Sequence, residues 1–317
     1  RSKGIGSAGE AELTDSSLLN LADNLGNIYF EADPLNGSWY DGIQLWLGLG
    51  DDRLNVTSIQ AVAPNRTITS VHAGNGSDVL GISLEYSDYS LFVGNGQGGN
   101  DELDASNSSL PVILFGDGGN DIIRGGSSED VLFGDYGRVF WIDEIGNEVA
   151  RVGSGGYDDY TDGVVRQIHR IEAVYPPYEI NYNDTVLISG NDTIYGNGKR
   201  DVIIGGGGEK DTIYGNGGSD LILGGFGELI FDDSNDGSLY GLRSIESLNC
   251  SDGSPSLLPS ESSQPSSQPS SQPSSQPSLQ PLDSGSNDIY GNGGDGKCAL
   301  MYFTTYCLFE KLMYFVY

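Results

Sequence analysis

Single apolar residues recur at nine-residue intervals in the middle of the chain, each following a stretch rich in Gly and polar residues. The clearest example is Gly116 to Phe133, which reads GDGGNDIIR and then GGSSEDVLF. In each nonapeptide six turn residues, ending in Asp, precede three strand residues. Side chains alternate along a strand, so the middle residue, Ile123 or Leu132, is expected to point inward. Each nonapeptide therefore predicts half a coil, made of one tight turn and one short strand.

The same form returns between Gly190 and Gly225 as GNDTIYGNGKRDVIIGGGGEKDTIYGNGGSDLILGG. Its Asp residues are spaced by 9, 10 and 9 residues, because one extra Gly stands in the run Gly205 to Gly208. Six nonapeptides in register, each with an apolar residue two places after the Asp, indicate one repeating module. The residues at position six of these nonapeptides are Asp121, Asp130, Asp192, Asp201, Asp211 and Asp220.

Three looser versions of the repeat come earlier in the chain, as LGLGDDRLN, AGNGSDVLG and GQGGNDELD. They place Asp52, Asp78 and Asp101 at position six, with Leu two residues later in each case. The steps from Asp52 onward to Asp121 are 26, 23 and 20 residues, which suits one full coil per repeat. We predict one continuous right-handed parallel solenoid with these Asp residues stacked along one edge. The alternative is that the three early turns are ordinary hairpin turns.

Both nonapeptide blocks end in the same way, in VLFGDYGRVFWID and in LILGGFGELIFDD. The third turn position is aromatic, at Tyr136 and Phe226, and position six, counted at Val139 and Leu229, has lost its Asp. We therefore expect these two turns to cap their blocks.

The stretch RVFWIDEIGNEVARV, which follows the first of these turns, predicts a hairpin that turns at Ile145 to Asn147. We expect it to cover a flank of the solenoid. Later, DGVVRQIHRIEAV aligns with DGSLYGLRSIESL, and SGNDTIYGNG returns as SGSNDIYGNG. The chain therefore reads as a tandem array of a larger unit. Near the N-terminus, NIYFEA and SWYDGIQLWLGL predict strands, and TDSSLLNLAD favours a short helix capped by Thr14 or Asp15.

Composition narrows the classes of function. The 317 residues include 45 acidic and 15 basic residues, for a net charge of −30. Such a field repels nucleic acid and anionic membrane surfaces and attracts cations. Three Cys are too few for a disulfide framework. The only two His, His72 and His169, lie far apart in sequence, and GGGGEKDT lacks the Gly-Lys-Ser/Thr of a phosphate loop. We therefore expect neither a catalytic residue nor an organic-cofactor site in this chain.

At the nonapeptides the sequence resembles the RTX, or haemolysin-type calcium-binding, β-roll family. The resemblance implies that calcium ions lie between turns of adjacent coils, held by position-six Asp carboxylates and main-chain carbonyls. It also implies that Asp192 and Asp211 share one edge of the roll, and Asp201 and Asp220 the other. Lys199 and Glu209 stand where the form has Gly at position four, which predicts weaker sites there.

Calcium prefers six to eight oxygen ligands, and Gly permits the backbone conformations that aim carbonyls at the ion. Several calcium ions are therefore the expected cofactors, and the calcium blocks are expected to fold only when they bind them. The predicted metal-site residues are the nine Asp named above together with Gly116, Gly118, Gly119, Gly125, Gly126, Gly196, Gly198, Gly206, Gly208, Gly215, Gly217 and Gly218.

The pattern divides the chain into eight predicted segments. The Ser/Gln/Pro repeats of the linker favour extended, disordered chain. The segments are a β-rich lead-in (1–47), a first calcium-binding block (48–134), a non-calcium excursion (135–181), a second calcium-binding block (182–232), a shorter excursion (233–253), the linker (254–282), the start of a third unit (283–296) and a hydrophobic tail with the character of a sequence artefact (297–317).

Open oxygen-ligand calcium modules bind at roughly 10⁻⁴ to 10⁻³ M, which suits extracellular fluid. We therefore predict a non-enzymatic structural or adhesive array at the cell surface or outside the cell. Its candidate partners besides calcium are wall or matrix glycans and other surface proteins, not nucleic acid or a membrane. The alternative is an accessory calcium-binding module of a larger secreted protease, lipase or polysaccharide epimerase.

Overall fold

The computed structural model describes residues 43–231 apart from 60–66, 89, 144, 155, 157–158, 161–167, 174–188, 209, 219 and 226–227. It also places the backbone of strands at 10–15, 18–21, 27–29, 288–290, 298–301 and 315–316. Every regular element in these residues is a β-strand. The predicted linker, 254–282, lies outside the described residues.

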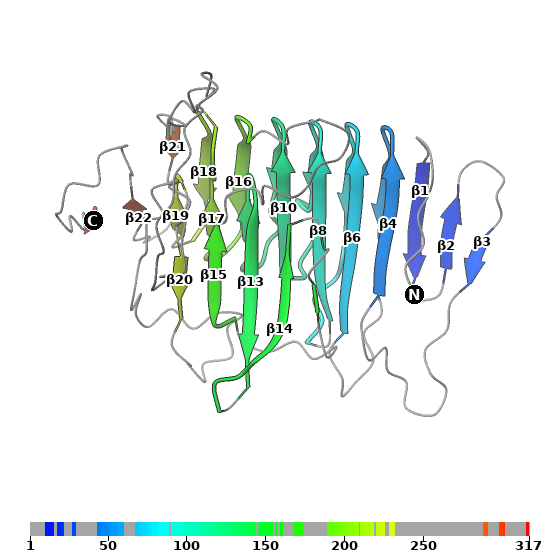
Figure 1. Cartoon of the computed structure of the whole chain (residues 1–317), viewed down its shortest axis with the longest axis horizontal. Coiled ribbons are helices and arrows are strands. Elements are labelled where there is room, and N and C mark those ends of the chain that lie inside the picture. The colour runs from blue at the N-terminus through cyan, green and yellow to red at the C-terminus, as the bar shows by residue number, and fades with distance from the viewer. Residues whose placement is uncertain are drawn as a thin grey trace, which may run out of the picture.

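From residue 43 onward, successive strands alternate between two parallel sheets, apart from four strands that form a third, antiparallel sheet. Each pair of alternating strands makes one coil of a solenoid. The coils stack along the long axis of the molecule (Figure 1). Sheet A consists of β4 (Ile43–Leu49), β6 (Thr67–Asn75), β8 (Ser90–Gly98), β10 (Val112–Gly118), β12 (Val131–Phe133), β17 (Val202–Ile204), β19 (Leu221–Leu223), β22 (Cys298–Met301) and an antiparallel end strand, β23 (Phe315–Val316). Sheet B consists of β5 (Arg53–Val56), β7 (Val79–Ile82), β9 (Glu102–Asp104), β11 (Ile122–Arg124), β16 (Thr193–Asn197), β18 (Thr212–Asn216), β21 (Asp288–Tyr290) and, at its N-terminal end, β1 (Glu10–Asp15), β2 (Leu18–Leu21) and β3 (Asn27–Tyr29).

The solenoid is continuous across the first excursion. Strand β11 pairs in parallel with β16, and β12 with β17, so that Ile123 lies opposite Ile194 and Leu132 opposite Ile203. The two predicted calcium blocks therefore contribute to the same two sheets. The prediction of an all-β parallel solenoid is confirmed, and its right-handedness stays a prediction.

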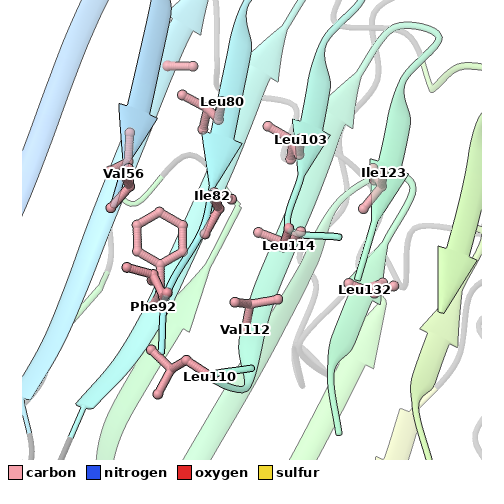
Figure 2. Packing of buried hydrophobic residues seen from close by; sticks show 14 of the residues in the cluster. Val56, Leu80, Ile82, Phe92, Leu103, Leu110, Val112, Leu114, Ile123 and Leu132 are labelled. Carbon is pink, nitrogen blue, oxygen red and sulfur yellow. The ribbon is translucent and has the colours of Figure 1, made fainter. Parts of the chain in front are cut away.

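An inner core fills the space between sheets A and B. The predicted inward residues of sheet B form one row in register, Leu54, Leu80, Leu103, Ile123, Ile194 and Ile213, and each is at most 1% exposed. Leu114, Leu132, Ile203 and Ile222 form the facing row on sheet A. Figure 2 shows part of this packing, with Leu103 and Ile123 near Leu114 and Leu132. Each coil adds only a few aliphatic side chains, so the core grows in proportion to the number of coils.

A second core covers the outer face of sheet A. The predicted hairpin is present as β13 (Gly137–Ile142) and β14 (Glu148–Gly153), with Gly146 at φ +87° in its turn. Together with β15 (Arg170–Ala173) and β20 (Glu228–Ile230) it forms an antiparallel sheet, sheet C. Apolar residues of sheet C, including the fully buried Trp141, pack with outward residues of sheet A such as Phe115 and Phe133. The prediction that the excursion covers a flank of the solenoid is confirmed.

The helix predicted at Thr14 is wrong. Residues Glu10–Asp15 and Leu18–Leu21 are strands instead, because β1 pairs in parallel with β5 at the end of sheet B and β2 pairs with β1. The local capping signal is outweighed by the main-chain hydrogen bonds that the open sheet edge offers. The strands expected from NIYFEA and from SWYDGIQLWLGL are present as β3 and β4.

The later part of the chain returns to the same solenoid. Strand β21, in the predicted third unit, pairs in parallel with β18, and β22, in the predicted hydrophobic tail, pairs in parallel with β19. Both strands therefore extend the same two sheets as β18 and β19.

Shortening an inner-core side chain should cost far more stability than shortening an outward one elsewhere in the solenoid. Ile203 is fully buried, so Ile203→Ala should lower the free energy of unfolding by about 2–5 kcal/mol. Ile122 is 38% exposed, so Ile122→Ala should change it by about 0.5 kcal/mol or less. Urea denaturation in saturating calcium measures both. Equal losses for the two variants would contradict the inward and outward assignment.

Candidate metal centre: two ladders of buried aspartates

Six of the predicted Asp residues form a ladder along one edge of the solenoid, where sheet A strands turn into sheet B strands. In each step the main-chain N–H of one Asp donates to Oδ1 of the Asp in the next coil, at 2.7–3.0 Å. The steps run through Asp52, Asp78, Asp101, Asp121, Asp192 and Asp211. The three early turns are therefore coils of the solenoid, and the hairpin-turn alternative is wrong.

The other three Asp residues form a second ladder on the opposite edge. Asp130 donates its main-chain N–H to Asp201 Oδ1 at 2.8 Å, and Asp201 donates to Asp220 Oδ1 at 3.0 Å. The ladder begins with Val112, whose N–H donates to Asp130 Oδ1 at 2.9 Å. The predicted division of Asp192 and Asp211 from Asp201 and Asp220 between the two edges is confirmed.

The turns adopt a regular left-handed backbone conformation at position two. There φ is +75° at Gln97, +71° at Asp117 and Asn197, and +61° at Asn216. Asn and Asp tolerate this conformation better than most side chains. Position four has positive φ at Gly99, Gly119 and Gly218, among others, which explains the Gly preference there.

Position one needs Gly because two oxygen atoms border its α-carbon. A methyl group on Gly196 would lie 2.6 Å from Asp201 Oδ2 and 2.7 Å from the carbonyl oxygen of Gly215 in the next coil. On Gly125 it would meet the Gly196 carbonyl oxygen at 2.6 Å and Asp130 Oδ2 at 2.8 Å. Gly116 and Gly215 also adjoin the Oδ2 of their own Asp. In more than one turn, a carboxylate oxygen and a carbonyl oxygen of the adjoining coil therefore lie together beside the position-one Gly.

The other predicted Gly residues allow the turns of adjacent coils to pack closely, because they have no side chain. Gly126 donates its N–H to Asp130 Oδ2 at 2.6 Å. A methyl group at the remaining positions would meet main-chain atoms of the adjacent coil or the side chains of Tyr136 and Asp135. These positions are Gly118, Gly119, Gly198, Gly206, Gly208, Gly217 and Gly218.

Oδ1 of Asp78 and of every later ladder Asp accepts a main-chain hydrogen bond, but in the described structure Oδ2 of at least five of them is buried without a hydrogen-bond partner. A buried carboxylate oxygen without a partner is costly, and such oxygens gather where a cation binds. The five are Asp78, Asp101, Asp121, Asp192 and Asp201.

Burial and mutual repulsion oppose ionisation of these carboxyl groups. Burial raises the pKa of Asp101 to about 9, and the charge of Asp121 adds to the shift. Burial raises the pKa of Asp201 to about 10, with a further contribution from Asp130. Burial is also the main cause of the raised pKa of Asp121 and Asp130, both to about 7. A cation beside these groups would offset both costs.

The arrangement fits calcium and not a transition metal. No three side chains of His, Cys, Asp or Glu in the described part of the chain converge on one metal position. An ion must therefore combine carboxylate oxygens with carbonyl oxygens of the turns, which is an all-oxygen set typical of Ca²⁺. The residues that would hold it are the ladder Asp residues and the position-one Gly carbonyls of the adjoining coil.

The prediction that the turn after Phe133 caps its block is wrong. Position six of that turn is supplied by Asp192, because Asp192 Oδ2 adjoins Gly134 as Asp121 Oδ2 adjoins Gly116. Counting along the sequence reaches Val139, which instead packs in the core under sheet C. Position-two residues Asp117 and Asp135 were also missed, although both are 1% exposed on the ladder edge. The only sequence signal for them was an acidic residue where the form has Gly.

The second ladder continues through the turn that contains Lys199, since Asp201 bonds to both neighbouring coils. Arg200 in this turn pairs with Glu129 at 3.4 Å. Glu209 lies outside the described residues. The predicted weakness of the two sites stays a prediction.

These features define a class of protein, the parallel β-solenoid whose turns stack buried carboxylates against main-chain carbonyls. The chain matches the RTX calcium-binding nonapeptide repeat, in four copies, over residues 113–138, 188–209 and 210–228. It therefore contains RTX calcium-binding nonapeptide repeats, and these repeats imply that it binds calcium. Comparison of the chain with curated proteins and with solved structures gave no match. Within the residues that the structure describes, no helix is long and apolar enough to span a membrane.

Without calcium, the solenoid should become less stable as the pH rises. Seven ladder carboxyls have raised pKa values, with about 6 at Asp78 and Asp220 and about 10 at Asp201, against 3.8 ordinarily. The folded chain then binds more protons than the unfolded chain, so stability is greatest near the ordinary value and falls through this range.

Thermal unfolding followed by circular dichroism, in calcium-free buffer at pH 5, 6, 7 and 8, tests this expectation. The melting temperature should fall as the pH rises from 5, and the unfolding transition should be lost toward pH 8, where the calcium-free chain is expected to be loose. In 10 mM calcium, expected to exceed the roughly 10⁻⁴ to 10⁻³ M affinity of such sites, the fall should be abolished because calcium replaces the protons. A calcium-free melting temperature that rises across this range would show that the carboxyls are not buried together.

A methyl group at position one should disrupt a calcium site. Gly196→Ala would place it against Asp201 Oδ2 and the Gly215 carbonyl, so the calcium needed for half-maximal folding should rise by about tenfold or more. Gly225→Ala is the matched control, because its methyl group would meet only the Gly206 carbonyl oxygen at 3.8 Å. Calcium titration of both variants, followed by circular dichroism, compares them. Equal midpoints would remove position one from the ion site.

Proposed function

We propose that this protein is a secreted, non-enzymatic array that calcium converts from a loose chain into a stiff solenoid with a structural or adhesive role. The observation that carries the proposal is the pair of Asp ladders. In these ladders, buried carboxylate oxygens still have no hydrogen-bond partner in the described structure after each coil has bonded to the next. Such a structure needs cations in order to be stable at neutral pH.

Electrostatics supports folding on ion binding. When the ladders are ionised, like charges repeat one coil apart, and the chain as a whole carries −30. The inner core offers only short rows of aliphatic side chains to oppose this repulsion and the loss of chain entropy. Ions between coils change repulsion into attraction at every step, so binding and folding are one process.

The fold supports an extended architecture. Coils contact mainly their neighbours, and β21 and β22 add a further coil after the second departure of the chain. Sheet C also gains a strand, β20, from the end of the second calcium-binding block. Further units can extend all three sheets in the same way.

The expected affinity supports a location outside the cell. Sites built from a few carboxylates and main-chain carbonyls bind calcium at roughly 10⁻⁴ to 10⁻³ M, close to extracellular levels. The same protein would then remain loose while inside the cell. Glycans of a wall or matrix and other surface proteins are the proposed partners.

Calcium titration of the whole chain is the decisive experiment. The β signal in far-UV circular dichroism should rise cooperatively between about 0.1 and 10 mM calcium, reverse with chelator, and not respond to magnesium, which prefers rigid octahedral sites. Small-angle X-ray scattering over the same titration should show an expanded chain becoming a compact particle. A fully folded particle that is indifferent to calcium would refute the proposed function.

A further inference from the structure

A row of stacked side chains lies on the outer face of sheet B, the face that points away from the inner core. Arg124, Tyr195 and Tyr214 occupy equivalent places in three consecutive coils, because β11 pairs with β16 and β16 with β18. Ile194 and Ile213, which precede the two Tyr residues, point into the inner core, so the Tyr side chains point outward. We call Arg124, Tyr195 and Tyr214 the aromatic ladder.

The two Tyr rings of the aromatic ladder are held face to face. Their centroids lie 5.0 Å apart, and their planes differ by 5°. Both residues are half-buried, so part of each side chain remains open to solvent. Tyr195 and Tyr214 are 19 residues apart in sequence, so it is the stacking of coils that brings their rings together. The register places Tyr290 of β21 opposite Tyr214, one coil further on.

Arg124 holds the Tyr195 ring from the preceding coil. Its guanidinium carbon lies 5.7 Å from the centre of that ring, which is a cation–π contact. Arg124 is itself fixed by Glu102, whose carboxylate oxygen lies 2.6 Å from Arg124 Nη1. Because Arg124 belongs to the coil before Tyr195 and Tyr214 to the coil after it, the Tyr195 ring is confined between the two. The Tyr pair is therefore preorganised in one relative arrangement.

Stacking alone does not require the phenol hydroxyls. Phe rings stack equally well, as Phe115 and Phe133 do beneath sheet C, with centroids 4.6 Å apart. The hydroxyl makes an outward ring easier to hydrate, and it also makes the ring a substrate for one-electron oxidants, which Phe is not. Two phenols held in contact at the surface are thus a pair that oxidation can join.

We propose that Tyr195 and Tyr214 are a site of oxidative modification, at which their two phenols couple to form a dityrosine link between adjacent coils. The three Cys of the chain all follow residue 231, so no disulfide can join the coils of residues 43–231 to one another. A carbon–carbon link between Tyr rings fastens coils without Cys and resists reductants. This inference goes beyond the proposed function and rests on it only for the calcium dependence of the Tyr pairing.

The reaction needs an oxidant that removes single electrons, and the class proposed is hydrogen peroxide acting through a peroxidase. Each phenol gives up one electron and its hydroxyl proton, and one peroxide takes up both electrons and both protons to become two waters. The unpaired electron of each phenoxyl radical is shared with the Cε ring carbons. One Cε–Cε bond forms, and the proton that each of these carbons loses restores a phenol hydroxyl. Preorganisation favours this coupling over encounters between separate Tyr residues.

Treatment of the whole chain with peroxide and a peroxidase, in about 10 mM calcium, tests the site. The monomer should gain dityrosine fluorescence, and mass spectrometry of its digest should find the Tyr195 and Tyr214 peptides joined, with two hydrogen atoms lost. Tyr195→Phe and Tyr214→Phe keep the ring stack but remove one phenol, so each should abolish this linked pair. Circular dichroism in calcium confirms that each variant folds.

Tyr160→Phe is the matched control. Tyr160 is 40% exposed and also lies beneath a guanidinium, since the Arg151 carbon is 5.3 Å from its ring centre. It lies beside β14 of sheet C and not in the aromatic ladder. Tyr160→Phe should therefore leave the yield of the link between Tyr195 and Tyr214 unchanged.

The link should also make the solenoid less dependent on calcium. It closes a loop of 19 residues, and a disulfide across a loop of similar size raises the folding equilibrium constant by about a hundredfold. The calcium concentration at half-maximal folding should fall by about twofold or more in oxidised wild type, because fewer ions are then needed to balance the unfolded state. Oxidised Tyr214→Phe should keep the midpoint of the untreated variant.

The outcomes separate two failures. If the chain folds in calcium but its monomer yields no link between Tyr195 and Tyr214, or only links between separate chains, the modification site is refuted and the proposed function stands. If the link forms equally well in calcium and in chelator, the ladder is assembled without the ion. The modification site is then supported, and the proposed calcium-dependent folding fails.

Discussion

The hydrogen bond from the main-chain N–H of one ladder Asp to the carboxylate of the next coil sets the geometry of this protein. It fixes the stacking of each coil to its neighbour at the turn, where the sheet ladder has ended. It uses only one of the two carboxylate oxygens and leaves the other buried beside the carbonyl of a position-one Gly. The same contact therefore aligns the strands and leaves buried carboxylate oxygens that a cation can bind. Stacking and ion binding thus depend on the same residues.

Protons and calcium compete for the buried carboxylates of the two ladders. A row of buried carboxyls at one-coil spacing either stays protonated or takes up cations, because ionised groups without counter-charge repel one another through a poorly solvated edge. Calcium suits the place because the ladders offer oxygens from flexible turns and no converging imidazole or thiolate. The proposed ion-dependent folding would then follow from the weakness of the inner core and not from a separate switch. Secretion would bring the chain into the calcium that it needs.

Sheet C changes the solenoid from a simple rod into a three-layered body along part of its length. Its apolar face covers outward residues of sheet A that would otherwise be exposed, and Phe115 stacks on Phe133 beneath it, with ring centroids 4.6 Å apart. The excursion reaches this position by leaving from the middle of a turn, so its attachment and the ion ladder share the same residues. Asp135, at the start of the excursion, accepts a hydrogen bond from the N–H of Gly190, at its end, so both ends of the excursion lie together at the ladder edge.

The sequence alone determined the solenoid, its inward residues, the row from Asp52 to Asp121 along one edge, and the division of Asp192 and Asp211 from Asp201 and Asp220 between the two edges. Position six and the apolar residue two places later obey a strict local spacing, and a parallel coil turns that spacing directly into stacking. It also predicted the hairpin, through alternation in RVFWID and the Gly146 turn. Only the tertiary structure decided that Asp192 completes the turn begun at Gly134, since nonapeptide counting assumes that consecutive turn positions are consecutive residues. It likewise placed β1 as a strand, because the open edge of sheet B offers hydrogen bonds that no local capping signal at Thr14 can match.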